Sequence, residues 1–266
     1  MRKILLRLEY DGGAYHGWQA QKNALSIQEI VDNKLEIILR ERVRTMASGR
    51  TDTGVHAFNQ PVTFRTDSDL SIRRIFASMN SILPDDIVIK EVIEVDDIFD
   101  ARRSAKKKTY RYVILNREAP SAIHRHRSWH LRKKLDLELM QKAAALIIGE
   151  HDFSSFRASG CTSRHPIRTV LSTSFHRGDS PFTKTPDEVD DRVNHLEETE
   201  GDYIIFEITA QAFLKQMVRN IMGTLVGLGQ GKIEFDQFNE ILAAKDRTRG
   251  GVTAPPEGLF LKDVKY

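Results

Sequence analysis

The sequence predicts an α+β protein of two related halves, with a mainly antiparallel sheet and its helices on one face. Three observations indicate this class. Strand-like and helix-like segments follow one another along all 266 residues. Each half repeats strands with packed helices, and the stretches LLRLEYDGGAY and IIFEITAQAF have similar patterns, which hints at duplication. We expect the boundary near residues 100–106, which gives an N-terminal half 1–103 and a C-terminal half 104–266.

The N-terminal half begins with a strand at 3–10 and continues with a helix that starts at Ser26. Ser26 and Glu29 have the spacing of a capping box, in which each residue satisfies a backbone N–H of the other. Apolar residues then recur at helical spacing: Ile27, Ile30, Val31, Leu35 and Ile38. The other elements expected in this half are strands at about 43–48, 60–65 and 86–95 and a helix near 70–82.

The C-terminal half combines strands with three predicted helices, the first of which is capped by Asp136. We expect strands at 108–115, 170–177, 202–209 and over GLFLKDV, and helices at 137–148, 214–228 and 235–244. The strands 170–177 and 202–209 form a hairpin joined by an acidic insert at 178–201. This insert contains Pro181 and Pro186 and few apolar residues, so we expect a mobile loop.

The net charge of +3 hides an asymmetry. The insert holds eight acidic and two basic residues, a balance of −6, so the rest of the chain carries +9. Basic residues gather in two blocks, at 102–111 and at 125–134, and Trp129 lies in the second. Basic blocks mixed with aromatic residues are typical of nucleic-acid binders. A merely solvated basic face is the alternative that charge alone leaves open.

Several classes of function are disfavoured. The lone Cys161 cannot form an internal disulfide, which suits a reducing cytoplasm. No stretch of about 18 apolar residues predicts a membrane span. HRHR at 124–127 favours a solvated loop over a metal site. GLGQGK at 227–232 lacks the Lys-Ser/Thr ending of a phosphate loop, and we interpret it as a helix end followed by a turn.

The segment GRTDTGVHA at 49–57 places two charged side chains in a glycine-bounded loop between strands. Arg50 and Asp52 face the same way if the stretch is extended, and the glycines let the backbone turn sharply. Such loops often carry function because a rigid scaffold positions them. A surface ion pair that stabilises little is the other interpretation.

The same segment resembles the active-site motif of the TruA-type tRNA pseudouridine synthases. Other segments resemble signatures of that family, in the family's order and over nearly the whole chain: EYDGGAYHGWQAQ (9–21), SIQE (26–29), LPDDI (83–87), FDARRSAKKKTYRY (99–112), HDFSSFR (151–157), SRHPIRTV (163–170), FLKQMVRNIMG (213–223), AAKDRT (243–248) and APPEGLFL (254–261). The resemblance implies the pseudouridine synthase fold, in which two related ferredoxin-like α/β halves form a mainly antiparallel central sheet flanked by helices.

The resemblance also implies an activity, the conversion of uridine to pseudouridine at positions 38, 39 and 40 of the tRNA anticodon stem-loop. Asp52 matches the family's catalytic nucleophile, and Arg219 matches the arginine that keeps this carboxylate ionised. Tyr110 matches the tyrosine beside the target base, and Arg50 matches the arginine that enters the RNA stem. The reaction involves no redox change, so no cofactor is required. The family works as a homodimer.

Two departures and two alternatives accompany this assignment. The insert at 178–201 is longer than the family's hairpin connection, and Thr53 stands where alanine is the more usual residue. A noncatalytic tRNA-binding protein on the same scaffold is one alternative. An enzyme acting on small sugars or nucleotides is the other, and it predicts little dependence of substrate binding on salt, whereas binding to tRNA weakens steeply with salt.

Overall fold

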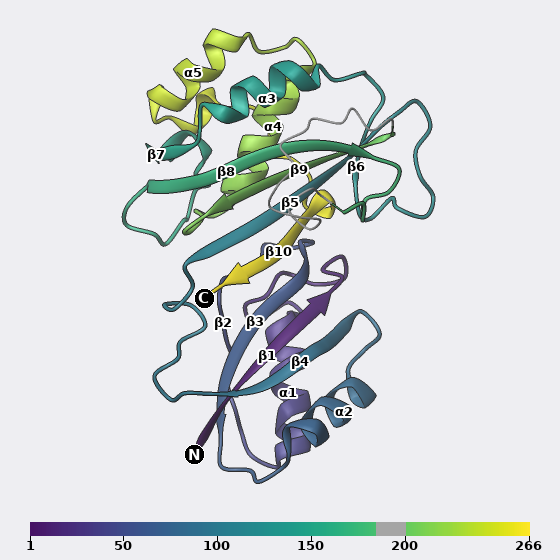
Figure 1. Cartoon of the computed structure of the whole chain (residues 1–266), viewed down its shortest axis with the longest axis vertical. Coiled ribbons are helices and arrows are strands. Elements are labelled where there is room, and N and C mark those ends of the chain that lie inside the picture. The colour runs from purple at the N-terminus through teal and green to yellow at the C-terminus, as the bar shows by residue number, and fades with distance from the viewer. Residues whose placement is uncertain (185–200) are drawn as a thin grey trace. The chain divides into compact units, whose positions relative to one another are not determined.

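The computed structural model describes residues 1–184 and 201–266, which form two compact units (Figure 1). The N-terminal unit contains residues 1–109 and 260–266, and the C-terminal unit contains residues 110–259. Most of the acidic insert, with the mobile loop expected there, lies outside the described residues. The division into halves at 103/104 remains a proposal about domains. The compact units differ from these halves because the last strand pairs with the N-terminal sheet.

The N-terminal unit is a sheet with two helices on one face (Figure 1). Its elements are β1 (Arg2–Tyr10), α1 (Ile27–Leu39), β2 (Met46–Ala47), β3 (His56–Thr66), α2 (Ile72–Ile82), β4 (Ile87–Val95) and, returning from the end of the chain, β10 (Leu259–Lys265). Within the unit the strand order is β4-β1-β3-β10, and β2 also pairs with β3. β1 is antiparallel to β3 and β4, whereas β10 runs parallel to β3.

Local sequence signals explain how α1 begins and which face it buries. The Ser26 hydroxyl accepts the N–H of Glu29 at 3.4 Å, which confirms the predicted start. Ile27, Val31 and Leu35 are fully buried, as their helical spacing predicted. The helix ends at Leu39, and Arg40 follows in the left-handed conformation with φ 57°.

In the described residues of the C-terminal unit, strands pack with three helices (Figure 1). Its elements are β5 (Lys107–Asn116), β6 (Trp129–Leu131), α3 (Leu137–Ala145), β7 (Gly149–Asp152), β8 (Ile167–Gly178), β9 (Tyr203–Ala210), α4 (Met217–Gly229) and α5 (Phe235–Ala244), with short 3-10 turns at Ser154–Phe156, Arg247–Arg249 and Pro256–Gly258. The strand order is β5-β9-β8-β7, and β6 pairs parallel to β5. The predicted hairpin is the antiparallel β8–β9 pair.

Helix α4 lies at the centre of the C-terminal unit. It is buried around most of its circumference, including the polar residues Asn220 and Thr224. A Cβ on Gly223 would lie 1.7 Å from the carbonyl oxygen of Val252, so only glycine allows this close packing of helix and chain. The GLGQGK segment ends this helix in a turn, in which the Gly231 N–H donates to the Leu228 carbonyl at 2.8 Å. The predicted helix end is therefore confirmed.

Some element boundaries were predicted wrongly. The strand expected at 43–48 is only Met46–Ala47, and the strand expected at 60–65 starts earlier, at His56. His56 and Ala57 are held in β3 by Phe260 and Leu261 of β10, partners that local sequence does not reveal. The helix expected at 214–228 starts at Met217 because Gln216 adopts a left-handed conformation with φ 58°.

One residue of the first basic block is part of the core rather than of a solvated face. Arg111 is 3% exposed and Glu207 is 4% exposed. The Arg111 Nε donates to Glu207 Oε1 at 2.8 Å, and Nη2 lies 2.8 Å from the same oxygen. The pair connects β5 to β9, so Arg111 does not belong to a nucleic-acid-binding surface.

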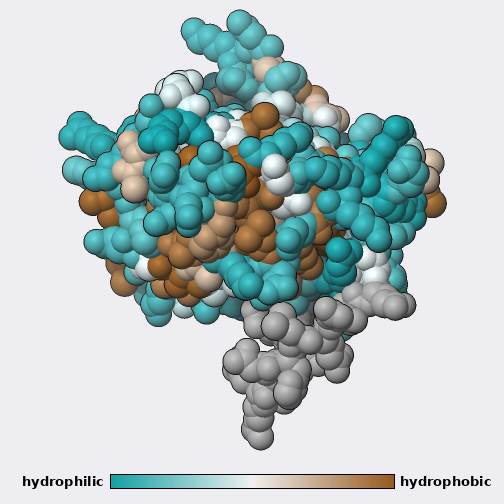
Figure 2. Space-filling view, turned by 90° about the horizontal axis from the view of Figure 1, so that it is seen from above, coloured by the Kyte–Doolittle hydropathy of each residue, from teal (hydrophilic) through white to brown (hydrophobic). Residues whose placement is uncertain are grey.

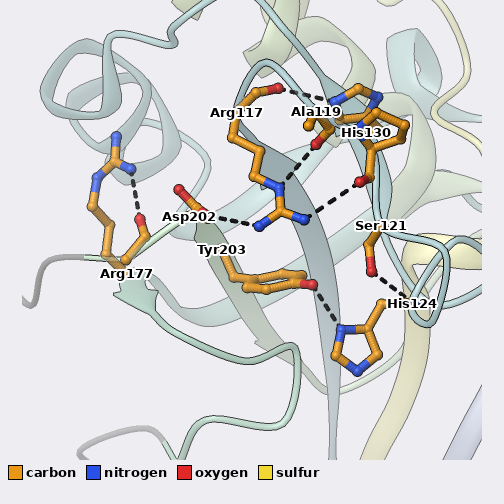
Figure 3. A network of polar contacts seen from close by, with 10 residues as sticks. Arg117, Ala119, Ser121, His124, His130, Arg177, Asp202 and Tyr203 are labelled. Carbon is orange, nitrogen blue, oxygen red and sulfur yellow. Dashed lines mark hydrogen bonds and ion pairs between the residues drawn. The ribbon is translucent and has the colours of Figure 1, made fainter.

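The loop between β5 and β6 is organised by Arg117, as Figure 3 shows. Its Nε donates to the Ala119 carbonyl at 2.8 Å and its Nη1 pairs with Asp202 at 3.0 Å. His124 Nδ1 lies 2.7 Å from the Tyr203 hydroxyl, whereas Arg125 and His126 are exposed. Across the described residues, no cluster of histidine, cysteine and acidic side chains has the arrangement of a metal site.

Candidate active site

The loop at 49–55 connects β2 to β3 and is closed by its own turn. The Val55 N–H donates to the Asp52 carbonyl at 3.1 Å. Gly54 has φ 77°, a conformation that glycine adopts without steric cost. Arg50 is exposed, whereas Asp52 is half-buried. The structure therefore places the two predicted residues on one loop, with Arg50 exposed just before the turn that begins at Asp52.

The segment at 10–18 holds this loop from one side. The Trp18 N–H donates to the Thr51 carbonyl and the Gly54 N–H donates to the Tyr15 carbonyl, both at 3.2 Å. The hydroxyls of Tyr10 and Thr51 lie 2.8 Å apart in a buried position. Asp52 lies between two backbone positions that are hydrogen-bonded to the same neighbouring segment, so its main chain is well defined.

Two glycines of that segment allow this close approach. A Cβ on Gly12 would lie 2.0 Å from the Val55 carbonyl oxygen. A Cβ on Gly17 would lie 2.5 Å from the Thr51 carbonyl oxygen, and Gly17 also has φ 84°. The stretch EYDGGAYHGW is therefore a backbone surface shaped to receive the loop that carries Asp52.

Polar side chains hold the start of the loop. Gln60 of β3 is fully buried and donates to the Gly49 carbonyl at 3.1 Å. Lys108 donates through Nζ to the Ser48 carbonyl at 2.5 Å. Burial, and then the charge of Arg102, lower the pKa of the Lys108 amine to about 8. A lysine that the sequence suggested only as part of a basic block is thus a support of the loop.

Tyr110 and Arg219 belong to the C-terminal unit. Tyr110 is 9% exposed, and its ring meets Phe213 edge-to-face with centroids 5.0 Å apart. Arg219 lies in the first turn of α4 and is half-buried. Its Nε donates to the Ala254 carbonyl at 2.7 Å, while the Ala254 N–H donates to the Arg219 carbonyl at 3.1 Å. Ala254 thus contacts both the backbone and the side chain of this arginine.

The segment 253–255, which contains the Arg219 partner Ala254, is itself held in place by buried polar groups. Asn220 is fully buried and its Oδ1 accepts hydrogen bonds from Thr253 at 2.7 Å and from Arg247 at 3.0 Å. The Tyr112 hydroxyl donates to the Pro255 carbonyl at 2.8 Å. Burial raises the pKa of Tyr112, so this hydroxyl keeps its proton. The supporting roles of Asn220 and Tyr112 were not predicted, because only the fold brings residues 253–255 onto α4.

Comparison with known proteins decides the family. A family model described as tRNA pseudouridine synthase matches residues 143–266. Over all 266 residues, the chain is 41% identical to tRNA pseudouridine synthase A of Thermoanaerobacter sp. strain X514 and 43% identical to that of Acetivibrio thermocellus, with 100% of both chains covered in each case. The chain belongs to the tRNA pseudouridine synthase A family.

Membership in this synthase family agrees with the architecture. The mixed, mainly antiparallel sheet with its helices confirms the predicted α+β class. Among solved structures, a Cbf5-Nop10-Gar1 complex matches 85% of this chain and 45% of that chain, at 12% identity and a TM-score of 0.37. Within the described residues, no helix is long and apolar enough to cross a membrane.

The four candidate site residues of the synthase therefore form two pairs, one in each unit. Arg50 and Asp52 share one supported loop in the N-terminal unit, and Tyr110 and Arg219 lie on β5 and α4 of the C-terminal unit. The catalytic roles of these four residues, and the pairing of Asp52 with Arg219, remain predictions.

Proposed function

We propose that this protein is an RNA-modifying isomerase that converts uridine to pseudouridine in the anticodon stem-loop of tRNAs, at positions 38, 39 and 40. The observation that carries the proposal is the full-length identity of about two residues in five to tRNA pseudouridine synthases A. The supported GRTDTG turn is the feature of this structure that fits the chemistry best.

Asp52 is the proposed nucleophile. In the reaction the bond from the ribose C1′ to N1 of uracil breaks, the detached base turns, and a bond from C1′ to C5 forms, while C5 loses a proton and N1 gains one. Nothing is oxidised or reduced, so no cofactor is needed. A carboxylate suits this exchange because covalent catalysis divides a difficult step into easier ones. The hydrogen bonds at Thr51 and Gly54 hold its backbone on both sides, which favours a reactive geometry.

Arg219 and Tyr110 have supporting roles in this proposal. A guanidinium beside a half-buried carboxylate favours its ionised form, which is the form that reacts. Ala254 orients Arg219 through two hydrogen bonds. The ring of Tyr110, steadied by Phe213, offers a surface for stacking on the target base.

Arg50 and the exposed basic residues would handle the RNA. Arg50 is exposed on the loop, as required of a side chain that enters the stem when the nucleotide leaves it. Exposed basic residues of the two blocks are available for phosphates: Arg102, Arg103, Lys106, Lys107, Arg125, Arg132, Lys133 and Lys134. Phosphate contacts position a substrate without specifying its bases, which suits an enzyme that accepts several tRNAs.

A homodimer is part of the proposal. Large apolar side chains are exposed at the β7–β8 edge, where Ile148, Ile167 and Leu171 are 43%, 51% and 44% exposed. The register of Gly149 with Val170 brings Ile148 near Leu171. In the view from above, Figure 2 also shows apolar side chains among hydrophilic ones at the surface, without identifying their residues. Apolar surface of this kind is typical of association sites.

The deciding experiment treats anticodon-arm transcripts with purified protein and maps pseudouridine chemically. The wild type should modify uridines at positions 38–40, and Asp52→Asn should bind the transcript but form no product. Product formed by Asp52→Asn would exclude Asp52 as nucleophile. Binding without product by the wild type would instead favour the noncatalytic tRNA-binding protein.

A further inference from the structure

An arginine-rich stretch lies outside the groups that the proposed chemistry uses. Residues 153–178 contain four arginines and no aspartate or glutamate. Two of these arginines stand at opposite ends of the exposed loop that connects the 3-10 turn at Ser154–Phe156 to β8. They are Arg157 and Arg168, and both are half-buried.

The two guanidinium groups converge on Ser163. Arg157 Nη2 donates to the Ser163 carbonyl at 2.5 Å and to the Cys161 carbonyl at 3.1 Å. Arg168 Nη2 donates to the Ser163 hydroxyl at 2.7 Å. Arg168 Nη1 donates to the carbonyls of His165 and Ile167 at 2.9 and 2.6 Å. These contacts hold two like charges close together on one loop.

Every hydrogen-bond acceptor of these two guanidinium groups is neutral, so their charges remain uncompensated within the described residues. The strand register places His151 opposite Arg168, and the neighbouring Glu150 and Asp152 alternate to the other face of β7. The Arg168 Nε is buried and makes no hydrogen bond. Burial and the charge of Arg157 lower the pKa of Arg168. Burial without a hydrogen bond makes the positive charge of Arg168 costly, and a nearby anion would offset that cost.

The lowered pKa of Cys161, the single cysteine of the chain, is consistent with this positively charged environment. Burial opposes ionisation of the Cys161 thiol, but hydrogen bonds from the backbone of Lys215 and Ser163 and from Arg157 outweigh it and lower the pKa of the thiol. Lys215 adds a third cation, because its Nζ would lie 3.9 Å from a Cβ on Gly160. The loop therefore carries a local excess of positive charge.

We propose that Arg157 and Arg168, with Ser163 between them, form a binding site for a phosphodiester group of the RNA substrate. Guanidinium groups match phosphate oxygens in geometry and charge. The site would hold the RNA backbone and would add affinity without reading bases. This inference rests on the proposed function, because that function supplies the RNA.

The first test uses Cys161, the only cysteine of the chain, as a reporter. The rate at which iodoacetamide alkylates Cys161 is measured for the wild type under three conditions: alone, with saturating anticodon-arm transcript, and with inorganic phosphate. The concentration of inorganic phosphate equals the total concentration of phosphate groups in the transcript. We expect the transcript to slow alkylation about tenfold or more and free phosphate to leave it unchanged. Equal protection by free phosphate would assign the site to a small anion and overturn the RNA assignment.

The second test measures how the affinity for the transcript depends on salt. Arg157→Gln and Arg168→Gln should each reduce the steepness of log K against log[salt] by about 0.7 to 0.9, the value of one phosphate contact. Arg168→Lys keeps the charge and should keep the steepness. Arg42→Gln is the matched control, because Arg42 is 91% exposed and already paired with Glu36 at 3.3 Å.

The outcomes separate this site from the function on which it rests. If the wild type forms pseudouridine while the transcript leaves Cys161 alkylation unchanged, the phosphate site is refuted and the isomerase stands. If the wild type neither binds nor modifies the transcript, the proposed function itself fails. Circular dichroism checks that each variant folds. If a variant does not fold, the protection of Cys161 in the wild type decides whether the phosphate site exists. Slopes unchanged in both glutamine variants would also overturn the site.

Discussion

Substituting one member of the Arg111–Glu207 pair should strongly destabilise the C-terminal unit. Both residues are almost completely buried, and two guanidinium nitrogens lie 2.8 Å from one carboxylate oxygen. Arg111→Met leaves the charge of Glu207 in a site of low polarity, and breaking a buried pair in this way costs about 3–5 kcal/mol. The Arg111 Nη1 also donates to the Thr183 carbonyl at 3.2 Å, so a further hydrogen bond is lost.

Urea titration followed by circular dichroism and tryptophan fluorescence measures this change. With a slope of about 2 kcal/mol per M urea, the midpoint should fall by about 1.5–2.5 M. Arg102→Met is the control, because it removes the same charge from an exposed position of the same block and should change stability by less than about 0.5 kcal/mol. The double variant Arg111→Met with Glu207→Leu should recover most of the loss, because no unpaired charge remains.

Two results would refute this reasoning. The first is that Arg111→Met lowers the free energy of unfolding no more than Arg102→Met does. The second is that the double variant loses more stability than the sum of the losses of the two single variants. The same proteins also test the correction to the basic block. The folded double variant should bind tRNA with the salt dependence of the wild type, whereas Arg102→Met should bind with a shallower one if Arg102 contacts phosphate.

Three further predictions concern the active loop and the surface. Gly17→Ala should lower kcat about a hundredfold with tRNA binding retained, because the added Cβ would displace the Thr51 carbonyl. Gly231→Ala is the control, because Gly231 also has a positive φ but has open space around it. Equal kcat values for the two variants would refute the packing argument. Lys108 has a folded-state pKa of about 8, below the ordinary value of 10.5. Between pH 8 and pH 10.5 the unfolded chain therefore binds one proton more than the folded chain. The free energy of unfolding should accordingly rise with pH over this range, by at most about 3 kcal/mol. Urea midpoints at pH 7.5 and 10 measure the rise, and an equal rise in Lys108→Met would contradict its assignment to Lys108. Leu171→Lys should convert a dimer to a monomer in light scattering, whereas Ile98→Lys, also at an exposed apolar position, should not, and a dimer unaffected by Leu171→Lys would exclude that edge.

Local patterns predicted most helices and strands because their causes are local. Ser26 and Asp136 cap helices through their own side chains, and the apolar spacing of α1 specifies its buried face. The short strands β6 and β7 were not predicted, because three or four residues carry too little periodicity. The early start of β3 depends on β10, whose Phe260 pairs with His56 from 204 residues away in the sequence.

By itself, the sequence determined the α+β class, the order of most elements, and the residues whose motifs resemble a tRNA-modifying family. Only the tertiary structure decided what the charged side chains do. Arg111 is buried against Glu207, Lys108 supports the Ser48 carbonyl, and Arg157 and Arg168 meet at Ser163. The physical reason is that the behaviour of a charge depends on its burial and its partners, and both are set by residues that only folding brings together.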